Sequence, residues 1–361
     1  MNIIHIAELN YELCNGIKTV ITALYLYQKR LGHTVFVLNL IDNKTKIFKE
    51  EYYIYSSTKF QKTINQIKPD IVVFHSIYKL PYFRFANYLV ENNIPYLIEP
   101  HGGTTIENQK KSYWKKKLAN ILWVNKFIEK ASAVIYLNQK ELENCIFTSK
   151  RKESYIIPNG VTTPLSFTSS RDSKIRFIFL ARLNIHHKGL DLLIHAIQHL
   201  CNKGYTDKFE FHFYGEADST KEQFAFEQLF ANIKKTGNIF YHGMAINEKK
   251  EMAFKNSDIY VLTSRYEGMP MSVLEALSHG IPCVITPQTN MQKIIEDNEC
   301  GWITDLDSNT IAQTLIMALD EFPKRKKTLN ENARKATLPY TWETIAKQTI
   351  SIYQTVIKGN N

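Results

Sequence analysis

The sequence predicts an α/β protein with two doubly wound, parallel sheets, and three observations lead to this class. Runs of β-branched and aromatic residues alternate with amphipathic runs along the chain, as in strands joined by crossover helices. A stretch rich in Pro, Gly, Ser and Thr, residues 159–174, interrupts this alternation near the middle. The 361 residues, 44% of them hydrophobic, can also supply two separate cores. We therefore expect an N-terminal domain at 1–165, a C-terminal domain at 166–338 and a last helix at 339–361.

Composition excludes several classes of protein. No apolar run approaches the ~20 residues that a membrane-spanning helix needs. The first residues, MNIIHIAEL, lack the basic start and the small-residue cleavage site of a signal peptide. The five cysteines are scattered and form no C-x-x-C pair, which is typical of buried thiols in a reducing compartment and favours neither a zinc site nor a disulfide framework. We expect a cytoplasmic protein.

The net charge of +10 is compatible with nucleic acid, an anionic membrane or an anionic substrate as a partner. No helix-turn-helix, zinc-finger or RNA-binding aromatic signature accompanies this charge. We therefore expect no nucleic-acid partner.

The first strand-to-helix turn of the chain contains a glycine. Residues 3–9 are predicted to form a buried strand and 19–31 a helix with one apolar face, and Gly16 lies between them. A glycine at this place lets the backbone approach a phosphate or a sugar closely, although a loop glycine more often serves only a turn. The absence of G-x-G-x-x-G argues against an NAD-binding turn.

Two histidines follow predicted strands of the first half. The strands PDIVVFHSI and IPYLIEPHGG run into His75 and His101, and the carboxyl ends of parallel strands share one edge of a sheet. At that edge a histidine can bond a sugar hydroxyl or share a proton near neutral pH. Taken alone, each histidine is more often a structural loop residue, and for His75 both roles stay open.

A basic amphipathic helix is predicted from about Ser112 to Lys130. Its apolar positions include Trp114 and Trp123, and lysines crowd its start: Lys110, Lys111, Lys115, Lys116 and Lys117. Tryptophan and lysine on one such helix suit an anionic membrane surface. A solvated helix with an ordinary buried stripe explains the same pattern equally well.

The second half opens with two cations at one strand-to-helix turn. The strand RFIFLARL ends near Arg182, and Lys188 stands at the start of the next helix. Two fixed cations at this place can neutralise a diphosphate, Arg182 through its planar fork and Lys188 as a point charge. The neighbouring His186-His187 lack the spacing of a metal-ligand pair and are interpreted as loop residues. The next strand, FEFHFYG, ends at Gly215.

The stretch SRYEGMPMSVLEALSHGIPC, residues 264–283, follows a strand and is predicted to form a turn and a short apolar helix. Such a turn lies at the carboxyl end of a strand, so backbone amides at the helix start suit a phosphate. These amides belong to Gly268, Met269 and Met271, while Pro270 suits the first helical position.

Two carboxylates flank this turn, Glu267 before it and Glu275 about one helical turn inside. Beside an anion site they are placed to accept hydrogen bonds from hydroxyl groups, so a phosphorylated sugar or a nucleotide is the expected guest. Each carboxylate also has a simpler explanation. Glu275 can close a capping box with Ser272, and Glu267 can be a solvated loop residue.

Four strings together resemble glycosyltransferase family 4, retaining enzymes of the GT-B fold that build bacterial cell-surface polysaccharides: EGMPMSVLEAL, R-L-x(n)-K-G-x-D, IIPNGV and PHG. The resemblance covers nearly the whole chain. It implies two Rossmann-like domains that face each other across a cleft, with the last helix crossing back to the first domain. It also implies transfer of a sugar, with retention at the anomeric carbon, from a nucleotide sugar held by the second domain to an acceptor held by the first.

The resemblance assigns roles to individual residues. It implies that Arg182 and Lys188 stabilise the leaving diphosphate, that Glu267 positions the donor sugar, that Glu275 binds the ribose and that His101 lies near the donor sugar. The other residues expected to contact the donor are Gly16, Gly215, Arg265, Gly268, Met269, Pro270 and Met271. No second carboxylate is identifiable as a covalent nucleophile, so we expect front-face attack, in which the leaving phosphate takes the acceptor proton.

Partners and cofactors follow from the same resemblance. Because the family commonly builds glycans on lipid carriers, it implies a glycan or polyprenyl-diphosphate-linked acceptor for lipopolysaccharide, O-antigen, capsule or exopolysaccharide. It also implies a peripheral position on the inner face of the cytoplasmic membrane through the Lys110–Lys117 region. Asp305 and Asp307 match the D-x-D metal motif of the other major glycosyltransferase fold but stand in the wrong architecture, so we expect no metal or other cofactor. The KRKK run at 324–327 is interpreted as a solvated loop.

Two rival functions stay open at this stage. A nucleotide-sugar epimerase of the same fold would convert the donor without an acceptor. A non-catalytic protein that binds a nucleotide sugar or a glycan would neither hydrolyse nor transfer the sugar.

Overall fold

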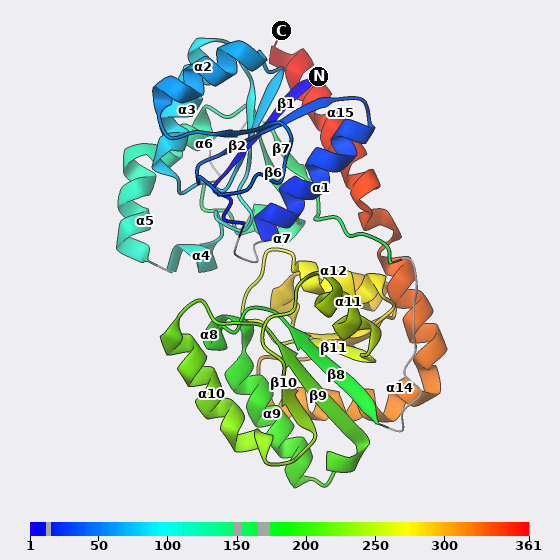
Figure 1. Cartoon of the computed structure of the whole chain (residues 1–361). Coiled ribbons are helices and arrows are strands. Elements are labelled where there is room, and N and C mark those ends of the chain that lie inside the picture. The colour runs from blue at the N-terminus through cyan, green and yellow to red at the C-terminus, as the bar shows by residue number, and fades with distance from the viewer. Residues whose placement is uncertain (12–15, 111, 148–152, 165–173, 361) are drawn as a thin grey trace. The chain divides into compact units, whose positions relative to one another are not determined.

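The chain divides into two compact units, shown in Figure 1: unit 1 comprises 1–160 and 342–361, and unit 2 comprises 161–341. Most of the predicted linker, together with Asn15 and Lys111, lies outside the described residues. The cleft expected between two domains stays a prediction. The computed structural model describes residues 1–11, 16–110, 112–147, 153–164 and 174–360.

Unit 1 is built on a seven-stranded sheet in which every neighbouring pair of strands is parallel. Central strands such as β4 are buried on both faces, which is why they appear in the sequence as unbroken apolar runs. The edge strands β3 and β7 have three residues each, too few to be predicted from such a run. In spatial order the strands are β3 (Glu51–Tyr53), β2 (Thr34–Asn39), β1 (Asn2–Ala7), β4 (Ile71–His75), β5 (Tyr96–Glu99), β6 (Ala133–Tyr136) and β7 (Ser154–Ile156).

Helices cover this sheet, and the last helix of the chain is one of them. α1 packs against α15, while α3 packs against both α2 and α6 (Figure 1). The single helix predicted at 112–130 is instead α5, a π-helical turn η1 and α6 in succession. The described helices of unit 1 are α1 (Gly16–Arg30), α2 (Ser57–Ile67), α3 (Leu80–Glu91), α4 (Ile106–Lys110), α5 (Tyr113–Ala119), η1 (Asn120–Val124), α6 (Asn125–Glu129), α7 (Gln139–Glu143) and α15 (Trp342–Asn360).

Aromatic side chains fill the core of unit 1 between the sheet and helices α3 and α6. Phe74, Tyr82, Tyr96 and Phe127 are fully buried. The rings of Phe74 and Phe127 meet edge to face at 90°, with centroids 5.2 Å apart. Packing of this kind adds ~0.5–1.5 kcal/mol per pair to the free energy gained from burial.

Unit 2 is built on a six-stranded parallel sheet with the same connectivity. In each unit the third, second, first, fourth, fifth and sixth strands lie side by side, which is the strand order of the Rossmann fold. In spatial order the strands of unit 2 are β10 (Ile239–Tyr241), β9 (Phe209–Tyr214), β8 (Ile175–Leu180), β11 (Ile259–Leu262), β12 (Cys283–Ile285) and β13 (Gly301–Ile303).

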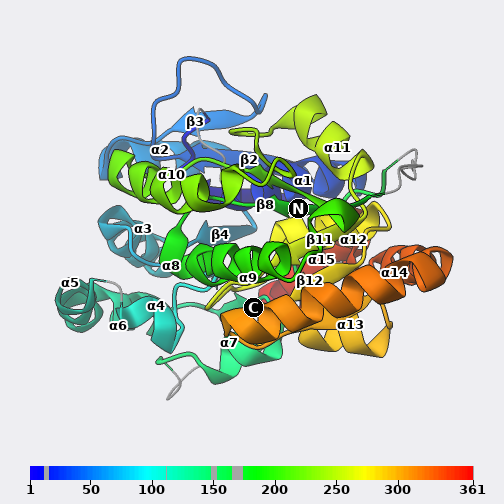
Figure 2. The same cartoon turned by 90° about the horizontal axis from the view of Figure 1, so that it is seen from below.

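The helices of unit 2 include one that corrects a sequence interpretation. The KRKK run is not a loop but part of α14, where Lys326 forms an ion pair of 3.1 Å with the buried Asp258. In Figure 2 α9 lies beside α10 and α14, and it packs against both. Asp307 caps the start of α14 by accepting a hydrogen bond of 2.9 Å from Thr310 N. The described helices are α8 (Ile185–Lys188), α9 (Leu190–Asn202), α10 (Thr220–Lys234), α11 (Asn247–Lys255), α12 (Met271–Ser278), α13 (Gln292–Asp297) and α14 (Ser308–Ala336).

Two glycines let strand-to-helix turns of unit 2 pack closely on the neighbouring backbone. Gly189, between α8 and α9, has a φ of +63°, and a Cβ added there would lie 2.1 Å from the carbonyl oxygen of Thr263. Gly215, just after β9, has a φ of +151°, and an added Cβ would lie 1.9 Å from Ala181 O. Only glycine meets both requirements, the dihedral and the close approach.

Gly189→Ala is expected to lower the free energy of unfolding by at least ~3 kcal/mol, because a steric clash adds to the cost of a left-handed backbone. Gly204→Ala is the matched control, since Gly204 also has a positive φ (+81°) but nothing lies within 4 Å of an added Cβ. That variant should lose only ~1 kcal/mol. Urea unfolding of both variants measures the difference, and equal losses would contradict the packing role of Gly189.

Candidate active site

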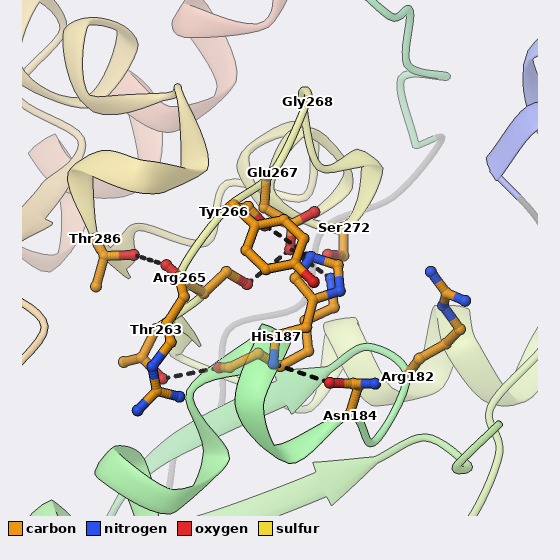
Figure 3. Close-up of polar contacts among 12 residues, drawn as sticks. Arg182, Asn184, His187, Thr263, Arg265, Tyr266, Glu267, Gly268, Ser272 and Thr286 are labelled. Carbon is orange, nitrogen blue, oxygen red and sulfur yellow. Dashed lines mark hydrogen bonds and ion pairs between the residues drawn. The ribbon is translucent and has the colours of Figure 1, made fainter. Parts of the chain in front are cut away.

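The site of unit 2 is formed by the turns that follow two adjacent parallel strands. β8 pairs with β11, so the turn after β8 and the turn after β11 emerge side by side at the carboxyl edge of the sheet. The first turn carries Arg182 and Lys188, and the second carries Glu267. Figure 3 shows polar contacts among residues of these two turns.

A buried ion pair lies at the centre of this site. Lys188 Nζ is 2.5 Å from Glu267 Oε1, and the Ser264 hydroxyl donates to the same oxygen at 2.7 Å. The side chains of Lys188 and Glu267 are only 9% and 11% exposed. Glu267 is therefore not the solvated loop residue that was one of its two explanations.

The environment of Glu267 keeps its carboxylate ionised. Burial alone raises the pKa of this carboxyl, but attraction to Lys188 and His187, with hydrogen bonds from Lys188 and Ser264, outweighs burial. The pKa of Glu267 consequently lies below its usual 4.5. The site combines a fixed anion and a fixed cation at neutral pH.

His187 is part of the site, which corrects its interpretation as a loop residue. Its ring stacks on Tyr266, with centroids 4.1 Å apart and an interplanar angle of 9° (Figure 3). His187 Nε2 lies 2.7 Å from the carbonyl oxygen of Tyr266, so that nitrogen donates, and burial lowers the pKa of the ring. A neutral, stacked His187 fixes the backbone beside Glu267.

The turn that carries Glu267 is also held by neighbouring polar groups. Glu267 N donates to Gln288 O at 3.0 Å, and Asn290 Nδ2 donates to Glu267 O at 2.6 Å. The hydroxyl of Thr286 donates to Ser264 O at 2.7 Å. These contacts preorganise the carboxylate.

Two arginines expected at this site differ in their surroundings. Arg265 forms a bidentate pair with Asp191 at 2.8 and 2.7 Å and also donates to His186 O. Arg182 is 57% exposed, pairs with Asp218 at 3.2 Å, and points away from the Glu267 cluster in Figure 3. Arg182 is the more accessible cation of the two.

Glu275, on α12, forms an ion pair of 2.7 Å with Lys250 of α11. Its alternative role in a capping box is wrong, because Pro270 is the N-cap of α12 and Ser272 instead accepts a hydrogen bond from Tyr260. Gly268 and Met269 precede this cap, and Met271 is the first helical residue. Gly215 lies at the end of β9, against Ala181.

The residues expected at the edge of unit 1 include Gly16, His75 and His101. Gly16 is the first residue of α1, and a Cβ added to it would meet nothing within 4 Å. His75 and His101 are hydrogen-bonded to each other at 2.9 Å, and His75 is fully buried. His101 has a φ of +49° and is followed by Gly102, whose N–H donates to Glu141 at 2.5 Å.

The basic segment of unit 1 exposes apolar side chains. Four apolar side chains of this segment face solvent: Trp114 is 75% exposed, Leu118 59%, Ile121 64% and Leu122 61%. Phe127, on α6, is by contrast fully buried. The alternative of an ordinary buried stripe is therefore wrong for α5, whereas η1 buries Val124 and packs Trp123 against the core. Among the described residues, no helix has both the length and the hydropathy to cross a membrane.

Two family models match this chain in succession. The model described as Glycosyltransferase Family 4 matches residues 14–164, and the model described as Glycosyl transferases group 1 matches residues 166–336. The chain belongs to the group 1 glycosyltransferases. The family resemblance and the fold class expected from the sequence are thereby confirmed.

Relatives of this group 1 chain include one of known acceptor and one from a polysaccharide locus. N,N'-diacetylbacillosaminyl-diphospho-undecaprenol alpha-1,3-N-acetylgalactosaminyltransferase of Campylobacter jejuni is 26% identical over 292 residues, 78% of this chain and 72% of its own. An uncharacterised 41.2 kDa protein in the cps region of Klebsiella pneumoniae is 22% identical over 355 residues, covering 91% of this chain and 92% of its own. Three other curated relatives are matched over about half of their length, 57%, 48% and 50%.

A solved structure shows the same fold. Anabaena HepE in complex with UDP superposes with a TM-score of 0.75 at 18% identity, covering 98% of this chain and 100% of that one. The GT-B architecture of the group 1 family therefore extends over the full chain.

Lys188→Met is expected to lower the free energy of unfolding by ~3 kcal/mol at pH 7, because Glu267 is left buried without its cation. In the wild type the depressed pKa of Glu267 contributes stability above pH 4.5 that is lost as pH falls through the folded-state pKa. In the variant burial dominates and raises this pKa above 4.5, so stability is present below pH 4.5 and lost as pH rises. The difference in free energy of unfolding between the wild type and the variant should therefore become smaller as the pH is lowered from 7 to 4.

Urea unfolding at pH 4, 5 and 7 measures this deficit. The double variant Lys188→Met/Glu267→Gln is the control, because it removes both charges and should show a deficit that does not change with pH. A deficit in Lys188→Met that is equal at pH 4 and pH 7 would contradict the ion pair.

Proposed function

We propose that the protein is a retaining hexosyltransferase that moves a sugar from a nucleotide sugar to a glycan or a lipid-linked oligosaccharide during the synthesis of a bacterial surface polysaccharide. Unit 2 binds the donor and unit 1 binds the acceptor. The observation that carries the proposal is the buried Lys188–Glu267 pair at the carboxyl edge of a Rossmann-like sheet, within residues 166–336 that the group 1 model matches.

The cations of unit 2 suit a leaving diphosphate. Lys188 has three N–H donors, and Glu267 occupies one of them, so the others are available to phosphate oxygens. Arg182 lies at the same strand-to-helix turn and offers its planar fork. Fixed cations stabilise charge that develops on the leaving group without reorganisation, which is usually the largest catalytic contribution.

The carboxylates suit hydroxyl groups of the donor. Ionised Glu267 is an acceptor only, so it orients sugar hydroxyls, and Glu275 binds the ribose from α12. Gly268, Met269, Pro270 and Met271 bring backbone close to the donor at the helix start. Gly16, Gly215 and Arg265 complete the donor-binding set.

The proposed reaction is a front-face substitution. The acceptor oxygen bonds to the anomeric carbon on the side from which the phosphate oxygen departs, and the acceptor proton passes to that phosphate oxygen. The products are the glycosylated acceptor and a nucleoside diphosphate, and the anomeric configuration is retained. Because Arg182 and Lys188 neutralise the diphosphate, no metal is required in this scheme.

The relatives support the choice of substrates. The Campylobacter jejuni relative is named for a diphospho-undecaprenol acceptor, and the Klebsiella relative lies in a cps region. HepE was solved with UDP. A nucleotide-sugar donor and a polyprenyl-diphosphate-linked acceptor are the corresponding partners proposed for this chain.

A lipid-linked acceptor gives the basic segment a role. Exposed Trp114, Leu118, Ile121 and Leu122 stand beside exposed lysines, a combination that binds the interface of an anionic membrane. We propose that the Lys110–Lys117 region, with these exposed apolar side chains, holds the protein peripherally on the inner face of the cytoplasmic membrane, close to its acceptor.

Arg182→Ala is expected to lower turnover at least ~100-fold, the scale of losing one donor to a developing anion. The test screens nucleotide sugars by thermal shift and by release of nucleoside diphosphate, with Arg325→Ala as a matched control at a surface arginine of α14. One donor should stabilise the wild type and be slowly hydrolysed, and Lys188→Ala and Glu275→Ala should lose both effects. Isomerisation without nucleotide release would establish an epimerase, and binding without turnover would establish a binding protein.

Lys115→Ala/Lys117→Ala is expected to weaken binding to vesicles of phosphatidylglycerol and phosphatidylcholine ~30-fold, since each lysine near an anionic surface contributes ~1 kcal/mol. Lys234→Ala/Lys235→Ala removes two exposed lysines of unit 2 and is the charge-matched control. Co-sedimentation measures the partition coefficient. Equal losses in both pairs would show that net charge alone, and not the segment, drives binding.

A further inference from the structure

A continuous chain of hydrogen bonds runs through the interior of unit 1 and ends at His101. His101 Nε2 lies 2.9 Å from His75 Nδ1, and His75 Nε2 lies 2.9 Å from His5 Nδ1. The chain continues over 2.9 Å from His5 Nε2 to Gln28 Oε1 and over 3.1 Å from Gln28 Nε2 to Thr349 Oγ1. His5, Gln28, His75 and Thr349 are at most 1% exposed. Because such buried groups must satisfy one another, each proton position constrains the next.

The direction of this chain is set at its Thr349 end. The Thr349 hydroxyl donates to Ala346 O at 2.8 Å, so its oxygen accepts from the amide nitrogen of Gln28. Gln28 must then turn its carbonyl oxygen toward His5. An oxygen acceptor requires a proton on His5 Nε2, and a neutral imidazole has only one N–H. His5 Nδ1 is therefore an acceptor.

The same rule passes along the next two rings. His75 Nε2 donates to His5 Nδ1, so His75 Nδ1 accepts from His101 Nε2, and His101 Nδ1 is left without a proton. Burial lowers the pKa of His5 to about 4, of His75 to about 3 and of His101 to about 4, so all three rings are neutral near pH 7. Burial also raises the pKa of Tyr353, whose hydroxyl lies beside Gln28 and Thr349, and this end of the chain stays uncharged.

Glu99 lies beside the hydrogen bond between His101 and His75. Its Oε2 lies 3.7 Å from His101 Nε2 and 3.3 Å from His75 Nδ1, so two acceptors face the Nε2 side of His101. Burial raises the pKa of Glu99, against the attraction of the nearby imidazoles. An ionised Glu99 would favour a proton on His75 Nδ1, so the direction assigned to the chain requires a protonated Glu99, and burial shifts its pKa toward that state.

Within the described ranges, one group of potential metal ligands is close enough together to hold an ion. It consists of His75, Glu99 and His101. The ring nitrogens argue for hydrogen bonds instead. Two nitrogens bound ~2.0 Å from a tetrahedral zinc ion lie ~3.3 Å apart. The 2.9 Å found at His101–His75 equals the distance at His75–His5, where no third ligand exists, and is that of a hydrogen bond.

We propose that Gln28 and Thr349 are positioning residues that act through His5 and His75 to hold the proton of His101 on Nε2, so that Nδ1 is presented as a hydrogen-bond acceptor. The inference rests on the proposed function, together with the role near the donor sugar that the family resemblance implies for His101. The substrate group that meets Nδ1 is then a donating hydroxyl and not a phosphate or carbonyl oxygen. α15, although last in the chain, thereby sets the chemistry of a residue at the edge of the unit 1 sheet.

The test is the tautomer of His101 in the full-length protein. Labelling with ¹⁵N-histidine and a long-range ¹H–¹⁵N correlation spectrum distinguish protonated from unprotonated ring nitrogens, and the signals of His101 are those missing in His101→Gln. In the wild type at pH 7 the proton is expected on Nε2. Thr349→Val removes the hydroxyl that orients Gln28 and should move the His101 proton wholly or partly to Nδ1. Thr349→Ser keeps the hydroxyl and should retain the wild-type tautomer.

Activity provides the second measurement. Thr349→Val is expected to lower kcat at least ~10-fold, and Thr349→Ser to keep it, because only Thr349→Ser retains the hydroxyl that orients Gln28. Gln28→Leu, which removes the acceptor for His5, is the second variant if Thr349→Val fails to fold, and it should give mixed tautomers.

Three results would overturn the proposal: a proton on Nδ1 in the wild type, an unchanged His101 tautomer in Thr349→Val, or one equivalent of zinc in the purified protein that His75→Ala abolishes. A shifted tautomer with unchanged kcat would support the hydrogen-bond chain and count against contact of His101 with the donor sugar. Failure of the inference and failure of the proposed function are therefore distinguishable.

Discussion

A carboxylate and an ammonium group that are both withdrawn from water determine how the rest of unit 2 is arranged. Burying either charge alone costs several kcal/mol, so Glu267 and Lys188 are tolerated only while they stay together. The adjacent strands β8 and β11 bring their turns to the same place, and Gly189 lets one turn lie directly on Thr263. The ring of His187, which stacks on Tyr266, lies beside this pair. Stability and preorganisation of the site have one physical origin.

Unit 1 meets the same requirement with neutral groups. Its sheet has the same strand order, and polar side chains again collect at the carboxyl edge, but here burial is offset by imidazole–imidazole hydrogen bonds and not by an ion pair. A neutral network tolerates burial with a smaller desolvation penalty than charges do. In such a network each hydrogen bond fixes the donor and acceptor roles of the next group. A change at one end of the network therefore affects the groups at the other end.

The sequence predicts the central strands because parallel strands covered on both faces are unbroken apolar runs. It does not predict β3, β7 or β13, which have three residues each and lie at or near sheet edges. The KRKK run was mistaken for a loop because its lysines hide the periodicity of α14, and the partner of Lys326, Asp258, is distant in sequence.

Local motifs reveal the site only in part. Arg182, Lys188 and Glu267 stand out because each follows a strand. The role of His187 depends instead on Tyr266, a residue 79 positions away in the sequence, on which its ring stacks and to which it is hydrogen-bonded. His5 lies in the middle of a strand and Gln28 and Thr349 in helices, positions at which sequence reasoning expects only packing. A hydrogen-bond chain through four elements becomes visible only when topology brings them together.

Unit 1 is discontinuous in the sequence, since α15 joins it after the whole of unit 2. During synthesis the ribosome releases all of unit 2 before α15, while domains generally begin to fold as they emerge. The nascent N-terminal portion must therefore wait with the face of α1 that packs on α15 uncovered. Unit 2 is therefore fully synthesised before unit 1, although synthesis of unit 1 begins first. The packing of unit 1 is completed only when α15 has been added.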